Sequence, residues 1–71
     1  MPIDKNWVLA YSFKLLYKAE MMQIILKDEN IESVIINKQD SSYFIGDIEL
    51  YVNPTDLLKA KNIIDNVENK E

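Results

Sequence analysis

The segment Asp47-Ile48-Glu49-Leu50-Tyr51-Val52 alternates between aliphatic and polar side chains. Successive side chains of a β-strand point to opposite faces of its sheet, so the three aliphatic residues share one face while Glu49 and Tyr51 share the other. This pattern predicts a strand that buries one face in a hydrophobic core.

An amphipathic helix is expected directly after this strand. Asn53 suits the N-cap of a helix, and Pro54 suits the first helical position, where its missing N–H loses no hydrogen bond. Apolar residues then recur at helical spacing, at Leu57, Ala60, Ile64 and Val67, with Ile63 beside them. This helix therefore presents one apolar face to the sheet.

Another strand precedes the alternating segment. Residues 31–37 contain the run Val34-Ile35-Ile36, and β-branched side chains of this kind are typical of a buried strand. A polar loop connects the two strands and ends at Gly46, the only glycine of the chain, which suits a turn or bulge with a positive φ angle.

The N-terminal third of the chain predicts a first strand. Residues 7–13 are rich in aromatic and aliphatic side chains. Uninterrupted alternation would place four of them on one face, namely Trp7, Leu9, Tyr11 and Phe13. Both faces of this strand are more apolar than a half-solvated strand requires.

A helix over about residues 14–29 follows, because the apolar spacing there changes to a helical period. Its core-facing stripe consists of Leu15, Ala19, Met22 and Leu26. Asn30 suits the end of this helix, because its short side chain tolerates a positive φ angle. A second stripe of Tyr17, Met21 and Ile24 belongs either to a broad core face or to a contact surface for another protomer.

The predicted order is strand, helix, strand, strand, helix, which indicates an α+β fold of the ferredoxin-like type. A right-handed crossover makes the first two strands parallel, and the third fits between them in the order 1-3-2, with both helices on one face. We expect residues 1–71 to form one domain with a core over about residues 7–67. The fourth strand of a complete ferredoxin-like sheet is missing.

Composition excludes several kinds of chemistry. With no cysteine and no histidine, the chain lacks disulfides, thiolate nucleophiles, the usual zinc ligands and a histidine base. Residues Lys38, Asp40 and Ser42 do not have the spacing of a known catalytic site. We therefore expect no enzyme activity, no metal site and no cofactor.

Charge and hydropathy narrow the set of partners. Eight lysines, no arginine and twelve acidic residues give a net charge of −4, which argues against nucleic-acid binding. The N-terminus lacks the pattern of a secretory signal, and no apolar run is long enough for a membrane helix. The sequence therefore predicts a cytoplasmic protein that does not enter a membrane.

The loop after the second strand is the first candidate binding site, because it has the densest cluster of hydrogen-bonding side chains in the chain. The candidate ligand-binding residues are Asn37, Lys38, Gln39, Asp40, Ser41, Ser42 and Tyr43. Through the loop at residues 37–44, the domain is expected to bind a small polar ligand or a protein. The alternative is an ordinary turn in which Asp and Ser side chains cap their own backbone.

The outer edge of the first strand is the second candidate site, because the missing fourth strand would have paired there. This edge carries no charge from residue 7 to residue 13, so nothing on it opposes pairing with another chain. The candidate interface residues are Trp7, Leu9, Tyr11, Phe13 and Tyr51. We expect a homodimer, unless the N-terminal segment folds back over this surface. A purely structural protein-interaction module is the alternative function.

Several stretches together resemble one bacterial family of small domains, described as prokaryotic signal transducing proteins. They are Trp7-Val8, Tyr11-Ser12, Ala19-Glu20, the stretch from Asn37 to Tyr43, and the stretch from Gly46 to Val52. The resemblance covers about residues 7–67. It implies a ferredoxin-like fold, related in outline to nitrogen-regulatory PII and ACT domains, and a regulatory role. The chain lacks the long effector loop and the arginine–lysine nucleotide site of PII proteins, so ATP or 2-oxoglutarate is not an expected ligand.

Overall fold

Three strands and two α-helices follow one another in the predicted order. The computed structural model describes residues 6–38 and 47–69 of the chain. Its elements are β1 (Val8–Phe13), α1 (Leu16–Asp28), β2 (Ser33–Asn37), β3 (Ile48–Val52), the 3₁₀ turn η1 (Pro54–Asp56) and α2 (Leu57–Glu68). The predicted α+β class is confirmed.

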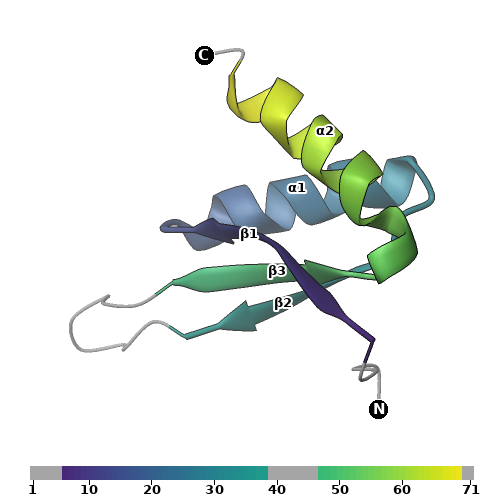
Figure 1. Ribbon diagram of the computed structural model, residues 1–71. Helices are drawn as coiled ribbons and strands as arrows, with labels where there is room; N and C mark the ends of the chain where they lie inside the picture. Colours follow the sequence, from purple (N-terminus) through teal and green to yellow (C-terminus); the bar gives the residue numbers. More distant parts are fainter. Residues whose placement is uncertain (1–5, 39–46, 70–71) are drawn as a thin grey trace.

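The strands form one sheet with β3 in the middle. The order is β1-β3-β2, and β3 is antiparallel to both of its neighbours, so β1 and β2 run parallel to each other. Figure 1 shows both helices on the same side of this sheet. The order 1-3-2 and the placement of the helices on one face are both confirmed.

The core lies between the sheet and the helices. Ile48, Leu50 and Val52 of β3 are fully buried, as their alternation predicts. The helices contribute Ala19, Met22 and Leu26 from α1, and Ala60 and Ile64 from α2. The other face of β3 carries Glu49 and Tyr51, which are only half-buried. One side of the sheet is therefore the core, and the other side is free of both helices.

A β-bulge in β1 changes which of its side chains share a face. The register with β3 shifts between Leu9 and Tyr11, so Ala10 is an extra residue in β1. Leu9 pairs with Tyr51 on the face away from the helices, whereas Phe13 pairs with buried Ile48 and is only 4% exposed. The prediction of uninterrupted alternation is therefore wrong, and the Phe13 side chain belongs to the core rather than to an interface.

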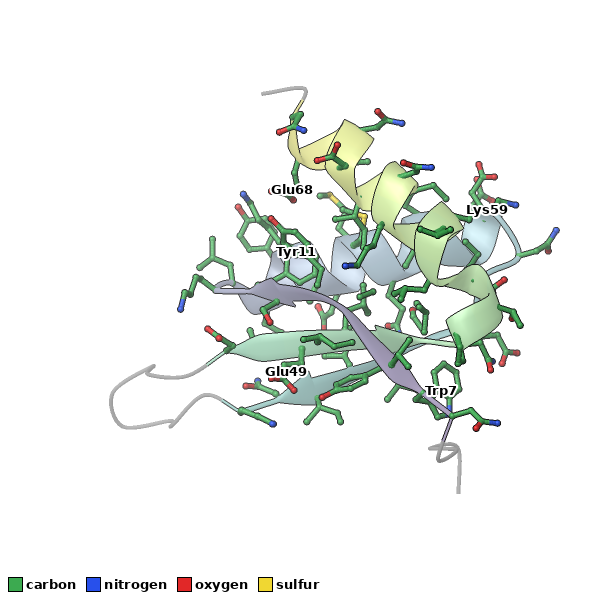
Figure 2. The ribbon with its side chains drawn as sticks, viewed as in Figure 1. Trp7, Tyr11, Glu49, Lys59 and Glu68 are labelled. Atoms are coloured by element: carbon green, nitrogen blue, oxygen red, sulfur yellow. The ribbon has the colours of Figure 1, made fainter. Side chains whose placement is uncertain are left out.

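Tyr11 is moved by the same bulge. It pairs with Leu50, whose side chain points into the core, and its ring lies 4.7 Å from that of Phe13 between centroids. In Figure 2, Tyr11 points toward the helices, and Glu49 lies on the opposite side of the sheet. Tyr11 and Leu9 consequently belong to different surfaces, contrary to the shared face expected for them.

The start of α1 also differs from the prediction. The helix begins at Leu16, and Leu15 is an N-cap residue with an extended backbone. Its side chain is 48% exposed, so Leu15 is not part of the core stripe, whereas Ala19, Met22 and Leu26 are. The residues of the second stripe, Tyr17, Met21 and Ile24, are exposed.

Asn30 ends α1 as predicted, with φ of 65°. The Asn30 N–H donates to the carbonyl of Lys27, and the Ile31 N–H donates to the carbonyl of Leu26, both at 2.9 Å. These two bonds form a Schellman motif, and buried Ile31 and Leu26 supply the apolar pair that accompanies it. The motif turns the chain from α1 into β2.

The entry to α2 uses a 3₁₀ turn in place of a side-chain cap. Pro54 occupies its first position, as the sequence predicts, but the Asn53 side chain makes no capping hydrogen bond. The Asn53 carbonyl instead accepts from the Asp56 N–H at 2.9 Å. The prediction of an Asn53 side-chain cap is therefore wrong, since the backbone makes the turn itself.

We predict that position 30 tolerates glycine but not alanine. Asn30→Ala is expected to lower the free energy of unfolding by about 1 kcal/mol, because alanine lacks the short polar side chain that can hydrogen-bond locally and so offset the strain of the left-handed conformation. Asn30→Gly should leave it unchanged or raise it slightly. Urea unfolding followed by circular dichroism measures both. Glu29→Ala is the control, since Glu29 has a negative φ. An equal effect of alanine at positions 29 and 30 would contradict the prediction.

Candidate functional site

The predicted loop site lies only in part within the described residues. Asn37 ends β2 and Lys38 follows it. The other candidate ligand-binding residues, Gln39, Asp40, Ser41, Ser42 and Tyr43, lie outside the described residues, as does Gly46. The Lys38 N–H donates to the Asp47 carbonyl at 3.0 Å, which closes the base of the loop one step beyond the paired strands.

A hydrogen-bonded charge cluster lies on the sheet face away from the helices. Glu49 and Tyr51 are two residues apart on β3, and the Tyr51 hydroxyl donates to Glu49 Oε1 at 2.7 Å. Lys38 Nζ lies 3.2 Å from the same oxygen. The Glu49 side chain is only 17% exposed. The Tyr51 hydroxyl and the Lys38 ammonium group together hold its carboxylate against the sheet. The cluster joins the end of β2 to the central strand.

The cluster shifts the pKa of each of its members, in favour of charged Glu49 and Lys38 and of neutral Tyr51. The hydrogen bonds from Tyr51 and Lys38 lower the pKa of Glu49, because both stabilise the carboxylate. The hydrogen bond to Glu49 and its negative charge raise the pKa of Lys38. The pKa of Tyr51 is also raised, chiefly because its proton is donated to Glu49. A general acid or base works best with a pKa near the working pH, so these shifts favour positioning and recognition over proton transfer.

Apolar side chains surround the charge cluster on the same face. Leu9 and Val34 both pair with Tyr51, from β1 and β2 respectively, and Ile36 pairs with Glu49. Residues directly opposite each other in neighbouring strands share a face. We call the surface formed by Leu9, Val34, Ile36, Glu49 and Tyr51 the open face. No helix within residues 6–38 and 47–69 covers it.

Trp7 lies beside the open face. It precedes β1, is half-buried, and lines a cavity of about 550 Å³ together with Val34 of β2 and with Ile24 and Lys27 of α1. Of the five predicted interface residues, Leu9 and Tyr51 thus meet on the open face and Trp7 lies next to it. Tyr11 lies on the helix side of β1, and Phe13 is buried.

A second ion pair stands at the base of the loop. Lys14 Nζ lies 2.7 Å from Asp47 Oδ1, and thereby links the segment after β1 to the residue before β3. The Lys14 side chain is largely in solvent and the Asp47 side chain is 41% exposed, so the pair contributes only about 0–1 kcal/mol to stability. The ion pair holds Lys14 beside Asp47. Since the Lys38 N–H also bonds to Asp47, all three residues lie where the loop leaves the sheet.

The outer edge of β1 is the other surface of interest. β1 pairs with β3 alone among the described strands, so its second edge has no partner strand there. A cavity of about 330 Å³ lies between Ala10 and Tyr11 of β1 and Lys61, Ile64 and Asp65 of α2. A cavity of about 210 Å³ continues from Tyr11 toward Lys14 and Glu68. We call these two adjoining cavities the edge groove.

Sequence reasoning missed the charge cluster. The spacing of Glu49 and Tyr51 places them on one face, but alternation alone does not indicate that their side chains are hydrogen-bonded to each other. Lys38 reaches Glu49 diagonally across the strands, and this approach depends on the register between β2 and β3, which the sequence does not state. The Lys14–Asp47 pair joins residues 33 positions apart and has no local sequence signal.

Acidic clusters and long apolar helices bear on two other kinds of site, for metal ions and for a membrane. Among residues 6–38 and 47–69, no group of three or more acidic side chains is arranged to hold a metal ion. The two α-helices of these segments are too short and too polar to cross a bilayer.

No protein-family model, curated protein or solved structure matches the chain. The resemblance to the signal-transducing family therefore stays a prediction.

We predict that Glu49 makes stability fall at acid pH. Its pKa is lowered in the folded state, so its contribution is fully present above its ordinary pKa of 4.5 and is lost as the pH falls through the folded value. Glu49→Gln should therefore flatten the decline in the free energy of unfolding between about pH 6 and pH 3. Urea unfolding across this range measures the effect.

Glu20→Gln is the matched control for that experiment, because Glu20 is exposed on α1, away from the cluster. The raised pKa values of Lys38 and Tyr51 have their effect at alkaline pH. Their contribution to the free energy of unfolding is lost as the pH rises from their ordinary pKa values through the raised ones. Identical acid profiles for the wild-type protein and Glu49→Gln would contradict the role assigned to the cluster.

Proposed function

We propose that this chain is a non-enzymatic regulatory domain that binds another protein through its open face. One observation carries the proposal: apolar Leu9, Val34 and Ile36 surround the Glu49–Tyr51 pair on a sheet face that neither helix covers. An uncovered apolar patch with a few fixed polar groups has the composition of the centre of a protein interface.

The charge cluster gives this face directional recognition. Lys38 is more than half exposed, so its remaining N–H donors are open to a partner, while Glu49 keeps it in place. Among the described residues, Lys38 is the lysine of the charge cluster on this face, and the chain has no arginine. So little positive charge favours a protein partner over a nucleic-acid backbone. The proposal keeps the cytoplasm of a bacterial cell as the expected location.

The domain is also proposed to act as a homodimer. The edge of β1 is uncharged from Val8 to Phe13 and carries no described partner strand. Charge, proline and bulges protect unpaired strand edges, and of these three β1 has only the bulge at Ala10. A two-fold dimer is the commonest closed solution for such a surface.

Binding of a small polar ligand at the loop of residues 37–44 is the second candidate function. The observation that favours it is the closed base of the loop, where the Lys38–Asp47 backbone bond and the Lys14–Asp47 ion pair hold charged groups in place. Binding residues often lie on loops that a rigid scaffold holds at both ends.

The open-face proposal predicts a position-specific loss of binding. Leu9 and Met21 are both 43% exposed, but Leu9 lies on the open face and Met21 lies on α1. Leu9→Lys should weaken capture of a partner by at least about tenfold, since ~1.4 kcal/mol is enough for that factor and a lysine buried without a partner costs more. Met21→Lys should leave capture unchanged.

Affinity capture from a lysate of the source organism, with both variants and the wild-type chain at equal concentration, measures this. Circular dichroism checks that both variants remain folded. Equal capture by all three chains, or equal loss in both variants, would refute binding through the open face.

The loop proposal has its own test. Thermal shift against a panel of nucleotides, amino acids and 2-oxo acids should show stabilisation by a true ligand, which adds about 2.7 kcal/mol at 100 times its dissociation constant. The triple change Lys38→Ala, Asp40→Ala and Ser42→Ala should abolish that response. A response that survives the triple change would place the ligand elsewhere.

A further inference from the structure

The edge groove has a strand as its floor and a helix as its wall. Figure 1 shows α2 lying over β1, with both elements running in the same general direction. Ala10 and Tyr11 lie opposite the middle of α2, at Lys61 and Asp65, and the end of β1 lies opposite Glu68. Position along β1 therefore corresponds to position along α2.

The floor of the groove is ready to accept a strand. β1 has the sequence VLAYSF, without charge or proline, and its outer edge has no described partner. The Ala10 bulge interrupts this edge near its middle. A regular segment lies on either side of the bulge, Val8–Leu9 before it and Tyr11–Phe13 after it.

The wall of the groove carries both signs of charge. Lys61 and Asp65 are four residues apart on α2, so they lie on the same side of the helix. Within the described residues Lys61 makes no ion pair, and the Asp65 carboxylate accepts only the Asn69 side-chain amide, at 2.8 Å. In Figure 2 the rim residue Glu68 lies above Tyr11, whereas Lys59 lies at the far end of α2.

We propose that the edge groove receives the β1 strand of a second copy of this chain. The two β1 strands pair antiparallel about a two-fold axis perpendicular to the sheet, near Ala10 and Tyr11. Lys61 of each protomer then faces Asp65 of the other. This inference deepens the homodimer of the proposed function by naming its surface and its cross-chain ion pairs.

The charge pattern selects a second copy as the occupant. Rotation about an axis near Ala10 and Tyr11 also passes the middle of α2, so residues 61 and 65 exchange places between the protomers. Opposite charges at these positions attract twice in a two-fold dimer, whereas charges of one sign would repel twice. The same rotation brings the segment before the bulge opposite the segment after it.

The test exchanges the two charges. Lys61→Glu makes positions 61 and 65 both acidic, and Asp65→Lys makes them both basic, so each variant alone should weaken dimerisation by at least about tenfold. An equimolar mixture of the two variants should recover dimers, because each chain then supplies the charge that the other lacks. The double variant Lys61→Glu/Asp65→Lys should also dimerise.

Light scattering coupled to size-exclusion chromatography, from micromolar to high micromolar chain concentration, measures the oligomeric state. Lys59→Glu is the matched control, because it makes the same charge change on α2 outside the edge groove. It should remain dimeric, and circular dichroism should show every variant to be folded. The mixture separates charge effects between chains from charge effects within one α2 helix, because mixing changes the partner of each chain but not its sequence.

Four results would overturn the inference, and three of them concern the α2 charges and the wild-type chain: a wild-type monomer at all concentrations, equal dissociation of Lys59→Glu and Lys61→Glu, or a mixture that stays monomeric. Failure of the open-face proposal is separate, because Leu9→Lys capture does not depend on the α2 charges. A dimer that Leu9→Lys dissociates and Lys61→Glu does not would move the dimer contact to the open face, and would also overturn the inference.

Discussion

Burial of the β3 side chains at positions 48, 50 and 52 is the constraint on which the rest of the structure depends. Among the described strands β3 alone has a partner on both sides, and both helices pack on the face that these three residues form. Because side chains alternate along a strand, the same constraint sends Glu49 and Tyr51 to the open face. A register slip of one residue would exchange the residues of the core with those of the open face, so one register determines both.

The bulge at Ala10 gives β1 a part in two surfaces. Before the bulge, Leu9 lies on the open face beside Tyr51; after it, Phe13 packs into the core against Ile48. A regular strand would have left both residues on one face, with Phe13 in solvent. The extra residue thus satisfies the core of a chain of 71 residues, which has little apolar surface to spare, without removing Leu9 from the open face.

The features that the sequence predicts well are those set by local periodicity or local backbone conformation. The alternation of β3, the apolar stripe of α2 and the positive φ of Asn30 all follow from residues within a few positions of one another. The bulge escapes such reasoning, because an apolar run with two apolar faces gives no sign of where an extra residue lies. The prediction that Leu15 belongs to the core stripe was wrong for a similar reason, since helical spacing does not state where the first turn begins.

The candidate sites also differ in whether local sequence is enough to predict them. Pairing of Lys38 with Glu49 requires the register between β2 and β3, and the Lys14–Asp47 pair requires the whole sheet. The edge of β1 was predictable, because it follows from counting strands in the expected topology. The loop residues from Gln39 to Tyr43 lie outside the described residues, so their role stays a prediction.

Within the described residues, the open face and the edge groove have different electrostatic characters, and for this reason we propose different partners for them. On the open face a carboxylate is already satisfied by Tyr51 and Lys38, so a second copy has no complementary charge to offer it. On the α2 rim, Lys61 and Asp65 complement each other under a two-fold rotation. Edge pairing about an axis perpendicular to the sheet keeps both helix layers on one side and both open faces on the other. A dimer built in this way would present two copies of the open face side by side, and a partner with two matching sites would gain from engaging both at once.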